Sequence, residues 1–225
     1  MKISVISLDF AGVIVSKSFI DYFWLELVPY AYSLRHSIPL SKAKSTVYEE
    51  YEKVGSNRIE WYLVDYWAKK FRIEEYIPKL LDIARSKIVV YNDAREVIPK
   101  LASKVSNIII ATNTSIEFIN LFFDAYPEFK RYIKKVYSCV SHYNMPHKTR
   151  EFYESIVEDL HIKPEEILHV GDDPIYDYEI PKSIGINAII VCRSRGKVLH
   201  GRNVISSLKE LLGIIEELNI ETRLN

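Results

Sequence analysis

The feature that most constrains the fold is an apolar run near the start of the chain that stops at a carboxylate. Residues Ile3 to Leu8 are rich in β-branched side chains, which favour a strand, and Asp9 follows directly. Gly12 then marks a loop that must approach Asp9 closely. A carboxylate at the end of a buried strand is costly without a partner or a function. Because ligands of open α/β sheets bind beyond the carboxyl ends of strands, Asp9 is the first candidate for chemistry.

Two later strand-like runs also end in polar residues. One stops at Thr112 and Asn113, and the other stops at Asp172 and Asp173. Strands that alternate with helices predict a mostly parallel sheet with right-handed crossovers, which brings these ends to one edge. The expected strands after the first are 107–111, 136–140, 167–170 and 188–191, and the expected helices are 94–104, 116–124, 128–135, 149–160 and 206–218.

The segment from Ser18 to about Lys87 has a different character, since it is rich in Tyr, Trp, Leu, Glu and Lys and lacks a strong strand run. Helical spacing predicts three or four helices. The first is expected to kink or end at Pro29, and the second to run from Ser41 to a stop at Gly55. Asn57 is expected to cap the next helix, and the last covers about 73–85.

Composition excludes several classes of function. The 225 residues include 30 basic and 30 acidic side chains, so the net charge gives no footprint for nucleic acid or an anionic membrane. No stretch approaches the roughly 18 apolar residues that a membrane span needs, so we expect a cytoplasmic protein. Cys139 and Cys192 lie at or near the ends of apolar runs and are interpreted as small core residues rather than a disulfide or nucleophiles.

The residues at the strand ends suit phosphoryl transfer. Asp9 and Asp172 together would bind Mg²⁺, which proteins hold through one or two carboxylates plus waters and substrate phosphate. The Thr112 hydroxyl and the Lys148 ammonium, from a loop expected on the same side, can bind anionic oxygens. Asp9 can then act as a nucleophile that forms an aspartyl-phosphate. The cation and Lys148 would offset the repulsion between the two anions.

In order along the chain, these elements resemble the four motifs of the haloacid dehalogenase-like (HAD) hydrolase superfamily. The first motif matches Asp9-Phe-Ala-Gly-Val13 and the second matches Thr112-Asn113. The third matches Lys148, and the fourth matches Val170-Gly-Asp-Asp173 with Asp177 four positions on. The helical insertion after the first motif resembles the mobile cap of one HAD subclass.

The resemblance implies a Rossmann-like α/β core, a parallel sheet with helices on both faces, formed by residues 1–15 and 89–225. Residues 16–88 would be an inserted all-helical cap. It also implies that Asp9 is the nucleophile and a metal ligand, together with Asp172 and the Ala11 carbonyl. The implied phosphate-binding residues are Thr112, Asn113 and Lys148, and the residues implied to support the outer shell of the metal are Asp173 and Asp177.

One position departs from the pattern of the superfamily's phosphatases. These usually carry a second Asp two residues after the nucleophile, which protonates the leaving group and later activates water. Ala11 occupies that position here and can do neither. Either the leaving group needs little protonation, as in an acyl phosphate, or another residue such as His142 or His147 supplies the proton.

Three other interpretations stay open. Phosphonoacetaldehyde hydrolases share the Ala and use a cap lysine, for which Lys42, Lys44 and Lys53 are candidates. The 2-haloacid dehalogenases also lack the acid, but they need no metal, and the acidic fourth motif argues against them. The third is a catalytically impaired relative that serves as a binding or regulatory domain. We expect a Mg²⁺-dependent phosphohydrolase that acts on a small phosphorylated metabolite, as a monomer or a homodimer.

Overall fold

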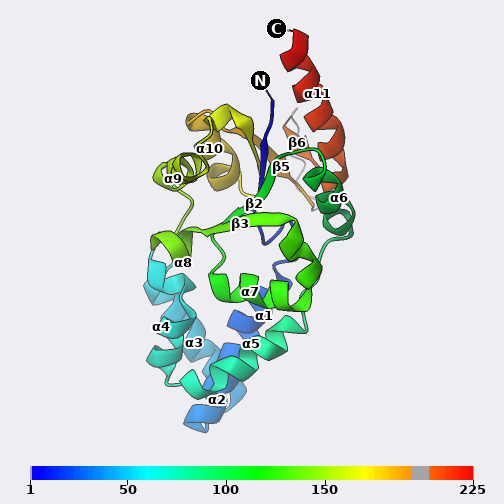
Figure 1. Ribbon diagram of the computed structural model, residues 1–225. Helices are drawn as coiled ribbons and strands as arrows, with labels where there is room; N and C mark the ends of the chain where they lie inside the picture. Colours follow the sequence, from blue (N-terminus) through cyan, green and yellow to red (C-terminus); the bar gives the residue numbers. More distant parts are fainter. Residues whose placement is uncertain (1, 194–202, 225) are drawn as a thin grey trace.

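A parallel sheet lies at the centre of the computed structural model, which describes residues 2–193 and 203–224 (Figure 1). Within these residues the sheet has six strands in the order β3-β2-β1-β4-β5-β6. The strands are β1 Val5–Leu8, β2 Asn107–Thr112, β3 Ile133–Ser138, β4 Ile167–Gly171, β5 Asn187–Val191 and β6 Val204–Ile205.

Helices cover both faces of the sheet, as predicted. Strand side chains alternate between the two faces, so apolar residues on each face need a layer of helices to bury them. Ile6 and Leu8 of β1 are buried in one core, whereas Val5 is buried in the other. The first core receives α6 (Asn92–Ala102), α7 (Ile116–Ala125) and α11 (Leu211–Leu224). The second receives α8 (Cys139–Tyr143), α9 (Arg150–Leu160) and α10 (Ile180–Ser183).

The strand ends that carry the polar motifs meet at one edge. Leu8 of β1 pairs with Ile110 of β2 on one side and with Val170 of β4 on the other. The residues that follow these three strands therefore leave the sheet side by side. This confirms the predicted convergence of the first, second and fourth motifs.

Helical elements between Ser18 and Arg85 gather beyond that edge (Figure 1). The chain enters and leaves this segment through two short stretches that pair antiparallel. The Ser16 N–H donates to Val89 O at 2.9 Å, and the Tyr91 N–H donates to Ile14 O at 3.0 Å. The elements are α1 Ser18–Tyr22, the π-helical turn η1 Phe23–Leu27, α2 Val28–His36, α3 Leu40–Val54, the 3₁₀ turn η2 Ile59–Tyr62, α4 Val64–Phe71, the 3₁₀ turn η3 Glu74–Tyr76 and α5 Ile77–Arg85.

The first helix does not end at Pro29, contrary to one of the two outcomes expected from the sequence. A π-helical turn precedes this proline, and the chain then continues through α2. Proline lacks the N–H that would bond to a carbonyl one turn earlier. The hydroxyl of Tyr48 donates to Leu25 O at 2.6 Å, and that of Tyr51 donates to Trp24 O at 3.1 Å. Side chains of α3 thus donate to carbonyls in the turn that precedes the proline.

The helix predicted over 128–135 is wrong. A 3₁₀ turn, η4 (Pro127–Arg131), is followed directly by β3, and the residues predicted to end this strand form α8 instead. β3 lies at the edge of the sheet, where charged side chains such as Lys135 face solvent and hide the strand pattern. The Ser138 hydroxyl accepts the Ser141 N–H at 3.0 Å and so caps α8.

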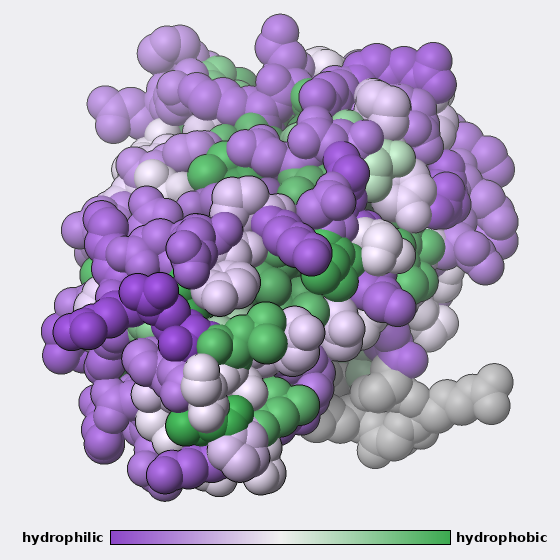
Figure 2. All heavy atoms as spheres, turned by 90° about the horizontal axis from the view of Figure 1, so that it is seen from below, coloured by the Kyte–Doolittle hydropathy of each residue, from purple (hydrophilic) through white to green (hydrophobic). Residues whose placement is uncertain are grey.

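Figure 2 looks onto the end of the molecule formed by the helical segment, where hydrophilic side chains surround a group of apolar side chains near the middle of the face. Among the large apolar side chains exposed in this segment are Leu25, Leu34 and Leu40. Cys139 is buried and Cys192 is half-buried, and no disulfide joins the two. Among the described helices, none combines the length and the apolar character that crossing a membrane requires.

Candidate active site

Asp9 and Lys148 form the buried centre of the candidate site. Asp9 leaves the sheet at the end of β1, and its Oδ1 accepts the Phe10 N–H at 2.8 Å. The Nζ of Lys148, which precedes α9, lies 3.4 Å from Asp9 Oδ2, and this side chain is 2% exposed. Burial raises the pKa of the Asp9 carboxyl, although the ammonium of Lys148 lowers it in part. A further positive charge would therefore favour the ionised form of Asp9.

Asp177 anchors this cluster from the turn after β4. Its Oδ1 accepts hydrogen bonds from Lys148 Nζ and, at 2.9 Å, from His169 Nε2. Its Oδ2 accepts the backbone N–H groups of Asp172 and Asp173 at 3.1 and 3.0 Å. Burial raises the pKa of Asp177, but the opposing effects of Lys148 and His169 are larger. The pKa of this carboxyl therefore lies well below its usual range. Asp177 thus fixes both the lysine and the loop of the fourth motif.

The positioning role of His169 was not predicted from the sequence. This residue is fully buried in β4, and its Nδ1 lies 2.8 Å from the Ser7 hydroxyl of β1. The hydroxyl of Tyr153 lies 3.1 Å from His169 Nε2. A histidine in an apolar strand gives no sequence signal for such a role, since its partners come from three different elements.

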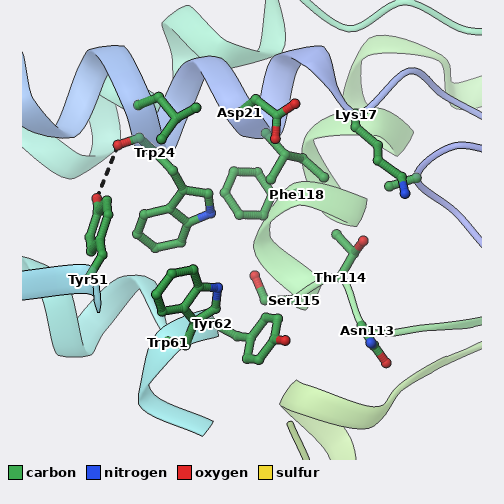
Figure 3. Close-up of a pocket in the computed structure, with 13 residues that line it drawn as sticks. Lys17, Asp21, Trp24, Tyr51, Trp61, Tyr62, Asn113, Thr114, Ser115 and Phe118 are labelled. Carbon is green, nitrogen blue, oxygen red and sulfur yellow. Dashed lines mark hydrogen bonds between the residues drawn. The ribbon is translucent and has the colours of Figure 1, made fainter. Parts of the chain in front are cut away.

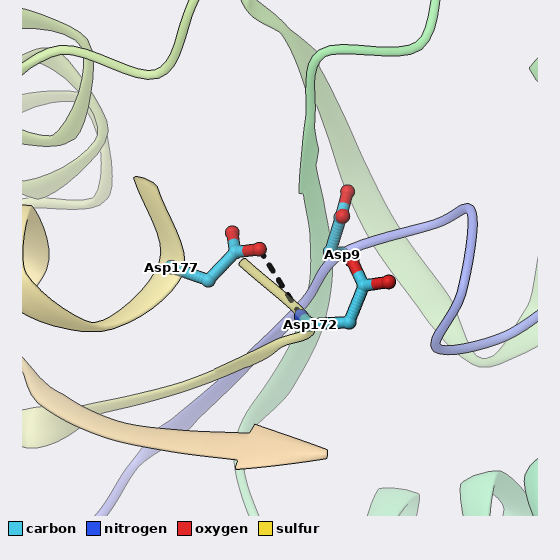
Figure 4. Close-up of side chains that lie close together, drawn as sticks. All are labelled: Asp9, Asp172 and Asp177. Atoms are coloured by element: carbon cyan, nitrogen blue, oxygen red, sulfur yellow. Dashed lines mark hydrogen bonds between the residues drawn. The ribbon is translucent and has the colours of Figure 1, made fainter. Parts of the chain in front are cut away.

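Three carboxylates meet where a cation could bind (Figure 4). One oxygen from each of Asp9, Asp172 and Asp177 lies within 4.8 Å of the others. Asp172 is half-buried, and Lys17 Nζ lies 2.7 Å from its Oδ2. Close carboxylates of this kind repel one another unless cations lie between them. The sequence identified the two aspartates at the strand ends but missed Lys17 as their partner.

The loop after Asp9 approaches the fourth motif closely, as its glycine predicted. Gly12 has φ +93°, and a Cβ there would lie 2.4 Å from Asp172 Oδ2 and 2.9 Å from Lys17 Cε. Arg193 holds the loop from the other side by donating to Gly12 O at 3.0 Å and to Val13 O at 2.8 Å. This brings the first and fourth motifs into contact.

Thr112 and Asn113 line the same edge. Thr112 is buried, and a hydrogen bond from its side chain lowers the pKa of Asp9. Its Oγ1 also accepts the Thr114 N–H at 3.1 Å. The Asn113 Oδ1 accepts a hydrogen bond from Cys139 Sγ at 3.0 Å. The hydroxyl predicted to bind phosphate therefore lies beside the candidate nucleophile.

Other predicted residues hold structure around the site. Asp173 Oδ1 accepts the N–H groups of Ile175 and Tyr176 at 2.8 and 2.9 Å, so this carboxylate caps a turn and does not join the acidic cluster. His142 Nδ1 accepts the Ser138 N–H at 3.2 Å. His147 stacks on Tyr176 at 4.6 Å, and its Nε2 lies 3.2 Å from Asn57 Oδ1 in the helical segment.

The helical segment and the sheet edge enclose a cavity of about 330 Å³ (Figure 3). Ala11, Lys17 and Asn113 line the end next to the candidate nucleophile. The rings of the remaining wall come from four separate stretches, and they are Trp24, Tyr51, Trp61, Tyr62 and Phe118. None of the sequence candidates Lys42, Lys44 and Lys53 lines this cavity, and two of them pair with Glu26 and Glu50 at 2.6 Å.

Comparison with known proteins places these motifs in a family. A family model described as haloacid dehalogenase-like hydrolase matches residues 3–185. No curated protein matches the sequence. The fold is similar to that of an HAD phosphatase from Thermococcus onnurineus, with a TM-score of 0.79 and 20% identity over 94% of this chain and 97% of that one.

Two more distant structures share the fold. YfnB from Bacillus subtilis, solved bound to magnesium, has a TM-score of 0.67 and 15% identity over 96% of this chain and all of that one. A 2-haloacid dehalogenase from Pseudomonas syringae pv. tomato DC3000 has a TM-score of 0.66 and 13% identity over 96% and 99%. These likenesses concern the fold alone. Because the family model spans most of the sequence and all four motifs meet at one sheet edge, the chain belongs to the haloacid dehalogenase-like hydrolase family.

Proposed function

We propose that the protein is a Mg²⁺-dependent phosphohydrolase of small phosphorylated metabolites, with Asp9 as the nucleophile. The observation that carries this proposal is the buried contact of Asp9 with Lys148, beside Asp172 and at the end of a cavity. A carboxylate, an ammonium, a hydroxyl and a cation site around one point suit phosphoryl transfer better than other hydrolytic chemistry.

The residues at this edge fit a divalent cation. Asp9 and Asp172 would provide carboxylate oxygens and Ala11 its carbonyl, while the acceptor oxygens of Asp177 are already engaged by four donors. Lys17 now occupies the Oδ2 side of Asp172 and would have to move for that oxygen to bind a cation. When bound, Mg²⁺ would supply charge stabilisation at the transferring phosphoryl group.

The side chains of this chain divide the remaining roles. Lys148 and the hydroxyl of Thr112 would orient the phosphate oxygens in line with Asp9. A bond would form between an Asp9 oxygen and phosphorus as the bond to the leaving group breaks, and water would then hydrolyse the aspartyl-phosphate. Ala11 supplies no proton to the leaving group. We therefore infer a leaving group of low basicity, such as a carboxylate or a phenol.

The helical segment 16–88 would act as a cap over a core of residues 1–15 and 89–225. Its contact with the core beside the site includes Asn57 against His147, and both connections between the parts run through the paired stretches at Val15 and Val90. Opening and closing about these connections would admit substrate and exclude water. Interdomain movement has been found in YfnB bound to magnesium, a protein of the same fold.

The test is phosphate release from phenyl phosphate with Mg²⁺ or with EDTA. We expect release only with Mg²⁺, and loss of at least about a thousandfold in Asp9→Asn, since the variant lacks the nucleophile. Asp65→Asn, which changes an exposed carboxylate of α4, is the matched control and should retain activity. Halide release from a 2-haloacid that is insensitive to EDTA, without phosphate release, would instead identify a dehalogenase.

A further inference from the structure

We propose that the cavity next to Ala11 binds the leaving group of the substrate and selects a compact group that carries a positively charged amine. This inference rests on the proposed phosphohydrolase function and adds the chemical class of the substrate. Three independent features of the cavity support it, namely its ring walls, an unpaired carboxylate and an unpaired buried hydroxyl.

The ring walls present several aromatic faces to one space. Trp24 lies edge-on to Phe118, with centroids 6.1 Å apart, and edge-on to Tyr51, with centroids 6.0 Å apart. Trp61 lies 6.0 Å from Tyr51 at an angle of 59°. Figure 3 shows Trp24, Trp61 and Phe118 around a common space. Ring faces carry partial negative charge and attract cations, with the strongest effect from tryptophan.

Asp21, which is exposed to solvent, adds a negative charge to the lining of this cavity. It projects from α1 into the space beside Trp24 and Phe118 (Figure 3). Within the described part of the chain its carboxylate makes no hydrogen bond or ion pair, although it feels the charge of Lys17. By contrast, Glu26 on the following turn is paired with Lys44 at 2.6 Å. An unpaired carboxylate beside aromatic faces favours a cationic ligand.

Ser115 supplies a second polar contact on the opposite wall. The residue is 4% exposed, and its Oγ has no hydrogen-bond partner among the described residues. It precedes α7 without capping it, and Figure 3 shows the hydroxyl directed into the cavity. A buried hydroxyl without a partner is costly, so a ligand that bonds to it would be favoured. It can accept an N–H or donate to an oxygen of the leaving group.

The charges that line the cavity disfavour anionic groups, and its volume admits a small group. Among the described residues that line the cavity, Lys17 is the one with a cationic side chain, and it is already paired with Asp172 at the catalytic end. A leaving group that carries a further anionic substituent beside Asp21 would therefore meet that carboxylate without a compensating charge. The volume of about 330 Å³ lies within the range of small-molecule pockets, so the cavity can hold a small ring that carries an ammonium group.

Binding of two matched phenols tests this proposal without turnover. They are 3-hydroxyphenyl-trimethylammonium and its neutral isostere 3-tert-butylphenol, and the readout is the fluorescence of the cavity tryptophans. We expect the cation to bind about 5–30-fold more tightly than the isostere, from the contribution of one charge beside ring faces. Asp21→Asn should reduce this ratio to about twofold or less, whereas Asp65→Asn should preserve it. Equal affinities in the unmodified protein, or a ratio that Asp21→Asn leaves intact, would overturn the proposal.

The phosphate esters of the same two phenols separate this proposal from the proposed function. We expect the kcat/KM of the cationic ester divided by that of the neutral ester to be lower in Asp21→Asn than in the unmodified protein. Comparing this ratio between the two proteins cancels the different basicity of the two leaving groups. If neither ester releases phosphate while the cation still binds selectively, the phosphohydrolase function fails and the cationic site stands. If both esters react and the ratio is the same in both proteins, only the cationic site fails.

Discussion

Replacing Asp177 by asparagine tests whether the buried cluster stabilises the fold. The side chain is fully buried and accepts from four donors, including Lys148, which is itself 2% exposed. Asparagine keeps the shape but removes the charge and turns one acceptor into a donor. That donor would then face the lysine and imidazole or the two backbone N–H groups.

The expected loss follows from this geometry. Removing one partner of a buried ion pair leaves the other charge without compensation, which costs about 3–5 kcal/mol. Lys148 would retain only the weaker contact with Asp9, at 3.4 Å. For a chain of this size, that loss corresponds to a fall in Tm of roughly 6–20 °C. The exposed ion pair of Glu154 with Arg150, at 2.7 Å, provides the control, because Glu154→Gln should cost at most about 1 kcal/mol.

The assay is urea and thermal unfolding in EDTA between pH 3 and 8. Because the folded-state pKa of Asp177 is lowered, its stabilisation is complete above the unfolded value near 3.9 and is lost as pH falls through the lower folded value. The difference between the unmodified protein and Asp177→Asn should thus be constant from about pH 5 to 8 and shrink below about pH 4. A loss no larger than that of Glu154→Gln would refute the reasoning, since the buried ion pair would then contribute no net stability.

Two further predictions concern the same edge. Gly171→Ala should cost at least about 1–3 kcal/mol in urea unfolding, because its Cβ would lie 2.0 Å from Asp177 Cγ, whereas Gly213→Ala, with open space around it in α11, should be neutral or stabilising. Mg²⁺ at a hundred times its Kd should stabilise the protein by about 2.7 kcal/mol, and this increment should vanish in Asp9→Asn. In EDTA that variant should be more stable than the unmodified protein at pH 7, since the raised pKa of Asp9 means that its ionised form costs stability as pH rises. Calorimetry with and without Mg²⁺ checks both statements. An equal Mg²⁺ increment in the two proteins would contradict the first, and an Asp9→Asn variant less stable than the unmodified protein in EDTA would contradict the second.

Local patterns accounted for most of the architecture. Strand runs that stop at Asp9, Thr112 and Asp172 predict one shared edge, because all strands of a parallel sheet point the same way. The patterns failed where a neighbour overrides propensity. Pro29 stays within a helical run whose preceding π-helical turn receives hydroxyl donors from α3, and β3 carries lysines because it is an edge strand.

The sequence by itself determined the family and the identity of the candidate nucleophile, since both follow from residue type, order and spacing. Only the tertiary structure decided how charges are paired, with Lys148 shared between Asp9 and Asp177 and with Lys17 on Asp172. It alone also joined Asp21, the rings and Ser115 around one cavity. The physical reason is that periodicity fixes which face of an element a side chain occupies, whereas contacts across elements depend on how those elements pack. Ala11 illustrates the difference. Its position in the sequence shows that the usual acid is missing, whereas its position in the cavity wall, seen only in the tertiary structure, indicates where the leaving group would bind.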